Sequence, residues 1–152
     1  MVIMLEPWYV TGFCDGEAAF TYSRASSSYA LYFAVKQRDD NCQIIEEIQQ
    51  FFNYVGYIYR GKESDESPKG GFTKPSAYYR VTKSRELQVI TDHFDKYPLQ
   101  SKKKFEAYKV WREMVMHKID NFRNPDYNML HALAGKLSNL NLQSRAFKRH
   151  TR

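Results

Sequence analysis

Two acidic side chains separated by one glycine, Asp15 and Glu17, are the residues of this 152-residue chain with the clearest chemical potential. They end a short apolar segment that has Pro7 in its first turn, where a missing backbone N–H costs nothing, so a helix is predicted there. Carboxylates held close together repel each other unless a cation lies between them, and a divalent metal with oxygen ligands is the usual answer. The alternative is a polar helix end with Gly16 as its C-cap before a strand.

Gly12 and Gly16 lie four residues apart, on one stripe of this predicted helix. Missing side chains at both positions would let a second helix approach to backbone contact distance. If two such helices cross, their terminal carboxylates meet near the crossing point. The spacing therefore favours a paired helix with a reaction centre at its end.

The composition is that of one ordinary globular domain, residues 1–152, with 43% hydrophobic and 26% charged residues. The net charge of +6 favours a polyanionic partner, although many proteins are this basic without one. Twelve tyrosines suit a surface that combines apolar area with hydrogen-bonding tips.

Compartment and membrane signals are sparse. Cys14 and Cys42 have no metal-ligand spacing and are interpreted as small buried hydrophobes in a reducing, intracellular compartment, either the cytoplasm or nucleoid or an organelle matrix. No apolar run approaches the roughly 18 residues of a membrane span, and no signal or transit peptide is recognised, so no membrane partner is expected. The four histidines show no ligand spacing either, and we assign them no metal role; they are His93, His117, His131 and His150.

Hydrophobic periodicity predicts two strand pairs, each following a helix. Residues 18–37 alternate as a hairpin with its turn at Ser26–Ser28, and Asp39-Asp40 caps a helix that Gly56 ends. Strands at residues 57–60 and 78–82 flank a turn-rich loop, residues 61–77. Ser84 is then predicted to cap a third helix that Pro98 terminates, and further helices are predicted from Ser101 and from Pro125-Asp126. The tail, residues 141–152, is basic, and is either a phosphate-binding arm or a frayed end.

The stretch from Val10 to Phe20 resembles the signature of the LAGLIDADG homing endonucleases, whose single-motif spelling is close to L-A-G-F-I-D-G-E-G-S-F. It matches at six positions: Gly12, Phe13, Asp15, Gly16, Glu17 and Phe20. Thr11 and Ala18 stand where the family has alanine and glycine. No second copy is present, since Leu133-Ala134-Gly135 is followed by Lys136 where acids are needed.

The resemblance implies an α+β, αββαββα fold whose four-stranded antiparallel sheet forms a saddle over the DNA major groove, with additional C-terminal helices. A single-motif chain has to dimerise to bring two acids together, and the resemblance places Gly12, Phe13 and Gly16 in the homodimer interface.

Catalytic roles also come from the resemblance. Glu17 binds the divalent metal, with the Gly16 carbonyl as an extra ligand, and Asp15 braces the helix end. The implied ion is Mg²⁺, which Mn²⁺ or Ca²⁺ can replace for binding. Gln37 orients the attacking water, although a polar strand end explains it equally well. Lys102 is the favoured active-site lysine and Lys103 the next candidate.

Residues expected to contact double-stranded DNA are outward strand positions, strand ends and the lysine run that begins the fourth helix. They are Thr21, Ser23, Arg24, Tyr32, Lys36, Arg38, Tyr57, Tyr59, Arg60, Lys62, Tyr78, Arg80, Lys103 and Lys104. Arginine reads guanine in the major groove, whereas lysines at the edges more often meet phosphate.

The sequence as a whole therefore predicts a homodimeric, metal-dependent, site-specific DNA endonuclease that cuts a long near-palindromic site and leaves short 3′ overhangs, with no small-molecule substrate. Two alternatives remain on the same fold: an intron RNA maturase and a DNA-binding protein without catalysis.

Overall fold

A computed structural model describes residues 4–25, 28–38, 41–61 and 76–141 of the chain. The predicted helix-strand-strand order, repeated once and followed by further helices, is confirmed. The elements are α1 (Pro7–Glu17), β1 (Ala18–Ala25), β2 (Ser28–Arg38), α2 (Cys42–Phe51), β3 (Tyr57–Gly61), β4 (Ser76–Val81), α3 (Ser84–Lys96), α4 (Lys102–Asp120) and α5 (Tyr127–Leu140).

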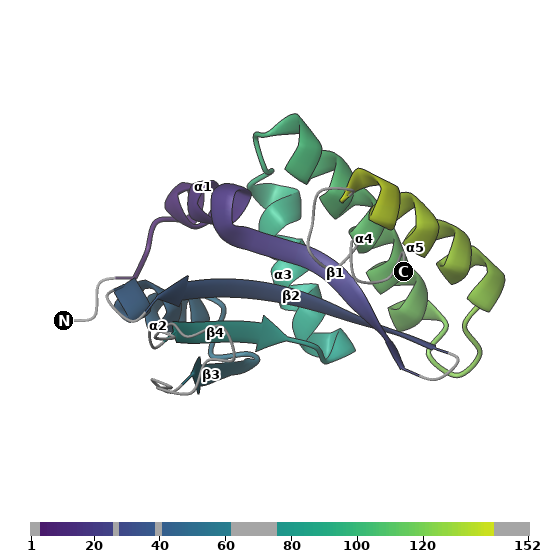
Figure 1. Cartoon of the computed structure of the whole chain (residues 1–152), viewed down its shortest axis with the longest axis horizontal. Coiled ribbons are helices and arrows are strands. Elements are labelled where there is room, and N and C mark those ends of the chain that lie inside the picture. Colours follow the sequence, from purple (N-terminus) through teal and green to yellow (C-terminus); the bar gives the residue numbers. More distant parts are fainter. Residues whose placement is uncertain (1–3, 26–27, 39–40, 62–75, 142–152) are drawn as a thin grey trace, which may run out of the picture.

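The four strands form one antiparallel sheet in the order β1-β2-β4-β3. Ala18 of β1 pairs with Val35 of β2, and Phe33 of β2 pairs with Val81 of β4. Because side chains alternate along a strand, this register fixes which residues share a face. Helices α2, α3 and α4 pack against one face. No helix of the described residues lies over the other face, which is turned towards the viewer in Figure 1 and which we call the open face.

The core lies between the sheet and the helices, as the alternation in residues 29–35 predicted. Phe33 is fully buried, and its ring contacts those of Phe20, Phe52, Tyr79 and Phe94. Burying one such side chain is worth about 1.5–3 kcal/mol. This packing makes the sheet a rigid platform for whatever its open face binds.

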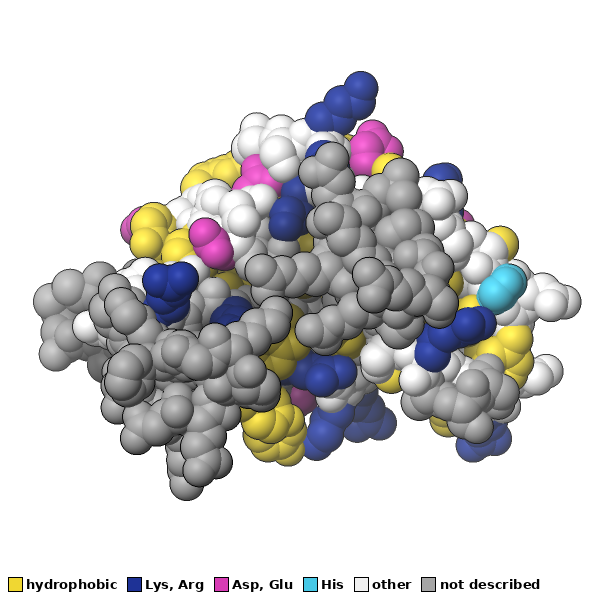
Figure 2. Space-filling model, in the orientation of Figure 1, with side chains coloured by type: hydrophobic (Ala, Val, Ile, Leu, Met, Phe, Trp, Pro, Cys, Tyr) yellow, Lys and Arg dark blue, Asp and Glu magenta, His cyan; other side chains and the backbone are white. Residues whose placement is uncertain are grey.

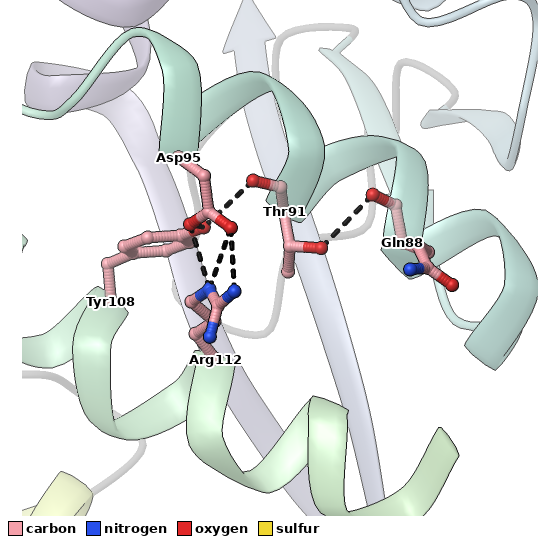
Figure 3. A network of polar contacts seen from close by, with 5 residues as sticks. All are labelled: Gln88, Thr91, Asp95, Tyr108 and Arg112. Atoms are coloured by element: carbon pink, nitrogen blue, oxygen red, sulfur yellow. Dashed lines mark hydrogen bonds and ion pairs between the residues drawn. The ribbon is translucent and has the colours of Figure 1, made fainter. Parts of the chain in front are cut away.

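A polar network joins α3 to α4 (Figure 3). Arg112 donates to both carboxylate oxygens of Asp95 at 2.8 Å, and the Tyr108 hydroxyl donates to Asp95 Oδ1, also at 2.8 Å. Burial, followed by the adjacent Asp95, raises the pKa of Tyr108, which therefore stays protonated. The network holds α4, whose first turn carries three lysines, in a fixed position against α3.

Helix α5 begins as predicted, because Asp126 accepts a hydrogen bond from the Met129 N–H at 3.1 Å. The helix packs on α4 and reaches β1, where the Tyr22 hydroxyl lies 2.7 Å from Ser138 Oγ. Across the described residues, no helix is both long and apolar enough to cross a membrane.

Several predicted element ends are wrong. Lys83, not Ser84, occupies the N-cap position of α3 and forms no side-chain cap. Helix α2 ends at Phe51, and the following residues Asn53 and Tyr54 adopt positive φ. Gly56 therefore does not terminate the helix. Gly56 has φ 76°, and a Cβ there would lie 2.6 Å from the Arg80 carbonyl oxygen, which requires glycine.

Strand β4 also starts earlier than expected, at Ser76. Some predicted features fall wholly or partly outside the described residues: the Ser26–Ser28 turn, of which the structure describes only Ser28, the Asp39-Asp40 cap, Lys62 with most of its loop, and the basic tail beyond residue 141.

Candidate functional site at the end of α1

The two acids at the end of α1 point in different directions and have different surroundings. Residues two apart on a helix are separated by about 200°, so their side chains cannot share a face. Asp15 contacts the start of α4, whereas Glu17 is exposed and has no hydrogen bond or ion pair with any described residue. The fold thus uses one acid internally and leaves the other available.

Asp15 caps α4 from another helix. Its Oδ2 accepts from the backbone N–H groups of Gln100 at 2.9 Å and Ser101 at 2.8 Å, and its Oδ1 accepts from Ser101 Oγ at 2.6 Å. Burial alone would raise the pKa of Asp15, but these hydrogen bonds and the charge of Lys104 outweigh it and hold the pKa below the usual value of 3.8. Asp15 is therefore ionised and fixes α1 against α4.

Replacing Asp15 with alanine is expected to lower the free energy of unfolding by about 2 kcal/mol at pH 7, because α4 loses its cap and three charge-assisted hydrogen bonds. Since the folded-state pKa lies below the unfolded one, this stabilisation is complete above about pH 5 and is lost as the pH falls through the folded value. Urea unfolding at pH 7 and pH 3 measures the change.

The matched control for this prediction is Asp92→Ala, because Asp92 is exposed on α3 and has no hydrogen bond or ion pair with any described residue. Equal destabilisation by the two variants, or a difference that does not shrink at pH 3, would contradict the role of Asp15.

Lys104 lies where the end of α1 meets the start of α4. Its Nζ donates to the Ala18 carbonyl oxygen at the junction of α1 and β1. Burial lowers the pKa of Lys104, and the charges of Asp15 and Glu17 act in the opposite direction. Lys104 thus supplies an internal positive charge beside both acids and ties the first turn of α4 to the residue after Glu17.

A pocket of about 540 Å³ adjoins this corner, and we call it the helix-end pocket. It extends from the end of α1 along β1 to the start of α4, and it reaches the open face of the sheet at Thr21 and Tyr32. Its lining residues are Asp15, Gly16, Ala18, Ala19, Phe20, Thr21, Tyr32, Ser101, Lys103, Lys104, Ala107 and Asn141.

Only two of the three consecutive lysines at the start of α4 line this pocket. Lys103 and Lys104 line it, whereas Lys102, the residue favoured from the sequence, is exposed and is not among the lining residues. Of the two lysines that line the pocket, Lys103 is exposed, whereas Lys104 is half-buried and donates to the Ala18 carbonyl oxygen.

Gln37 lies at the same end of the sheet as Glu17. It comes two residues after Val35, which pairs with Ala18, and therefore lies two residues beyond the start of β1. The Gln37 side chain is half-buried and accepts a hydrogen bond from Asn41 Nδ2 at 3.3 Å. It does not line the helix-end pocket.

The outer face of α1 is apolar and notched. Trp8 is 54% exposed and Tyr9 is 52% exposed, and Phe13 stacks on Tyr9. A Cβ added at Gly12 or Gly16 would meet no atom within 4 Å. Contiguous exposed apolar surface of this kind is typical of an interaction site. The predicted interface residues Gly12, Phe13 and Gly16 thus lie on a helix face that the described chain leaves uncovered.

Thr11, which stands where the family signature has alanine, is fully buried on the opposite side of α1. Its hydroxyl donates to the Tyr97 carbonyl oxygen at 2.8 Å and lies 3.0 Å from Nε2 of His93. Burial lowers the pKa of His93 to about 4, so the ring is neutral near pH 7. The departure at position 11 therefore anchors α1 to α3.

Most of the predicted DNA-contacting residues share the open sheet face. Thr21 pairs with Tyr32, Lys36 with Tyr78, and Tyr57 with Arg80. By the same alternation, Ser23, Arg38 and Tyr59 face this side. In the orientation of Figure 2, Lys and Arg side chains lie beside hydrophobic side chains below the centre, and most of the acidic side chains in view lie along the upper part.

Arg24 and Arg60 belong to the other face of the sheet. Arg24 donates to the Tyr29 hydroxyl at 3.3 Å, and Arg60 pairs with Glu46 of α2. Alternation along β1 and β3 places both arginines on this face, but it does not identify Tyr29 or Glu46 as their partners.

The donors at this site fit a divalent metal such as Mg²⁺. Glu17 offers an exposed carboxylate without a protein partner in the described chain, and the backbone of Gly16 borders the helix-end pocket. No group of three or more His, Cys, Asp or Glu side chains that could hold an ion occurs among the residues described. Mg²⁺ commonly binds through one or two carboxylates and substrate phosphates, and does not require a complete protein cage.

Comparison with solved structures places this fold among known ones. The homing endonuclease I-TnaI superposes with a TM-score of 0.69 at 20% identity, covering 97% of this chain and 94% of that one. The LAGLIDADG meganuclease I-AabMI, solved bound to uncleaved DNA, superposes with a TM-score of 0.68 at 26% identity, but this chain covers only 43% of it.

Sequence relatives are longer proteins. A probable intron-encoded endonuclease of Schizosaccharomyces pombe, Cox1-I1b, is 23% identical over 94% of this chain. An uncharacterized 50.9 kDa protein in ND4 intron 1 of Podospora anserina is 25% identical over 74% of it. The chain spans 34% and 24% of the lengths of these two proteins.

A family model described as LAGLIDADG endonuclease matches residues 10–115, which run from α1 to the middle of α4. The match contains the end of α1, the whole sheet and the first turn of α4. On this match, and with the fold shared with the solved homing endonucleases, the chain belongs to the LAGLIDADG endonuclease family.

Proposed function

We propose that this chain is a site-specific DNA endonuclease that hydrolyses phosphodiesters with a divalent metal, and that it acts as a homodimer on a long near-palindromic site, leaving short 3′ overhangs. The observation that carries the proposal is the divergence of the two acids. Asp15 is used within the chain, while Glu17 stays unpaired among the described residues, at the end of an exposed, glycine-notched helix.

Pairing of two α1 helices through Gly12 and Gly16 would place Glu17 of one copy near that of the other. I-TnaI, which this chain matches over 94% of its length, supports a folding unit of this size. I-AabMI is matched over only 43% of its length. A second copy of this chain is the partner we propose.

DNA would lie along the open sheet face, which the helix-end pocket reaches at Thr21 and Tyr32. I-AabMI, solved on uncleaved DNA, supports this partner. A phosphate at the mouth of the pocket would then meet the charge of Lys103, and Lys104 would hold the Ala18 carbonyl in place beside it.

The proposed metal ligands are the Glu17 carboxylate and the Gly16 carbonyl oxygen. A bound Mg²⁺ would supply positive charge to the scissile phosphate and lower the pKa of water. Gln37, at the same sheet end, is proposed to orient the attacking water, because its amide both donates and accepts.

Cleavage of a plasmid library carrying randomised inserts tests the proposal. We expect linear products with Mg²⁺, no products with EDTA, and mapped ends that carry short 3′ overhangs. Binding without cleavage under both conditions would support a DNA-binding protein without catalysis. Assisted splicing of an intron RNA without DNA cleavage would support a maturase, for which the intron locations of the two relatives provide a reason.

Lys103→Met is expected to lower the cleavage rate about 100-fold, because the pocket loses the cation that can face the phosphate. Lys102→Met is the matched control, since it removes the same charge from the neighbouring exposed position and is expected to change the rate only slightly. Single-turnover cleavage of a mapped target measures both rates. A larger loss with Lys102→Met would restore Lys102 as the active-site lysine.

A further inference from the structure

Arg80 has an unusual position on the open face of the sheet. It lies in β4, an interior strand, opposite Ala34 of β2 and Tyr57 of β3. The nearby cations Lys36 and Arg38 belong to β2. A ligand that lies across this face therefore meets Arg80 on one interior strand and Lys36 on the neighbouring interior strand, with Arg38 at the end of β2.

Two contacts describe the state of the Arg80 guanidinium. Its Cζ lies 4.0 Å from the centre of the Tyr32 ring. Its Nε is buried and has no hydrogen-bond partner, and no carboxylate pairs with it in the described parts of the chain. A buried donor without a partner costs free energy, and burial beside an aromatic ring strengthens the cation–π attraction that opposes this cost.

The geometry explains why Arg80 takes this orientation. Tyr32 precedes Ala34 by two residues and lies diagonally across from Arg80 on the same face, within reach of a long side chain. The small side chain of Ala34 leaves the space between them open to the guanidinium. Tyr78 and Tyr59, which pair with each other, border the other side. The planar group thus rests on an aromatic support, with its terminal nitrogens as the remaining donors.

We propose that Arg80 is a specificity-determining residue that reads a guanine in the major groove through two hydrogen bonds, with Tyr32 as its support. Guanine offers O6 and N7 as adjacent acceptors, which match the fork of an arginine. This assignment rests on the proposed DNA-binding function. It favours a base edge over a phosphate because the Arg80 guanidinium lies over the Tyr32 ring, which limits the directions of its remaining donors. Lys36 carries a point charge on a flexible stem and is the expected phosphate contact.

Selection from a duplex DNA library with randomised positions tests this proposal. The full chain is used with Ca²⁺ in place of Mg²⁺, so that bound duplexes stay intact. For the parent we expect an enriched sequence with guanine at one position of each half-site. Arg80→Ala should reduce discrimination at that position by about 10- to 100-fold and leave the other positions unchanged.

Three further variants distinguish a base contact of Arg80 from a phosphate contact. Arg80→Lys keeps the charge but loses the fork, so it should lose the guanine preference and keep part of the affinity. Tyr32→Leu should weaken the preference at the same position. Lys36→Ala, the matched control, should weaken binding to all sequences evenly and reduce its salt dependence.

Thermal unfolding of each variant first shows that it folds. An even loss of affinity across all sequences with Arg80→Ala would overturn base reading in favour of a phosphate contact. An unchanged selection would also overturn it, leaving the Arg80–Tyr32 pair as part of the sheet packing. If the parent enriches no sequence at all, the proposed site-specific function fails together with the role of Arg80. If the parent enriches a sequence that Arg80→Ala does not change, only the role of Arg80 fails.

Discussion

Glu17→Gln is expected to reduce DNA cleavage by at least about a thousandfold while leaving duplex binding intact. A divalent ion contributes several kcal/mol to a phosphoryl-transfer transition state, and each 1.36 kcal/mol is tenfold in rate. The amide is nearly the same size as the carboxylate but carries no charge to hold the cation. Single-turnover cleavage and gel-shift titration of a mapped target measure the two effects.

The direction in which Glu17→Gln changes DNA affinity provides a second test of the metal-ligand role. Without divalent metal, Glu17→Gln should bind DNA as tightly as the parent or slightly more tightly, because a negative charge near the phosphates has gone. Stability should not change, since Glu17 is exposed and has no hydrogen bond or ion pair with any described residue.

Glu113→Gln provides the matched control, because Glu113 is also exposed and unpaired within the described chain but lies on α4. This variant should cleave normally. Full cleavage by Glu17→Gln with Mg²⁺ would remove the proposed metal ligand, and equal losses in both variants would assign the effect to net charge.

The fold could be predicted because its signals are local. Alternation in residues 29–35 identifies the buried side of β2, the Asp126 cap identifies the start of α5, and the glycine spacing in α1 identifies the notched face. Each of these depends on neighbours within a few residues, where side-chain periodicity and capping rules apply. At the start of α3 the local signal was misleading, because Ser84 is a common cap residue but Lys83 occupies the N-cap position and forms no side-chain cap.

The site was harder to predict because its contacts join distant segments. Asp15 accepts hydrogen bonds from Ser101, 86 residues later in the chain, and Lys104 donates to the carbonyl of Ala18 across the same separation. A run of three lysines has no internal feature that says which one faces the pocket, since that depends on the rotation of α4. The network of Asp95 and Arg112 sets this rotation, and it too lies in tertiary structure.

Replacing Gly12 with leucine is expected to abolish dimer formation and cleavage while making the isolated subunit slightly more stable. Within the chain, a Cβ at Gly12 meets nothing within 4 Å, and leucine is a better helix former than glycine by up to about 1 kcal/mol. Across a symmetric interface the added side chain occurs twice, and overpacking costs about 1–3 kcal/mol each time. The dimer dissociation constant should then rise by roughly 30-fold to more than a thousandfold.

Gly135→Leu is the matched control for this last prediction, because Gly135 is exposed on α5 and a Cβ there also meets nothing within 4 Å. Both variants should raise the free energy of unfolding by a similar amount, whereas only Gly12→Leu should lose association in sedimentation equilibrium. A dimeric, active Gly12→Leu would show that the α1 notch is not the interface. A parent that stays monomeric at every concentration would overturn the proposed homodimer.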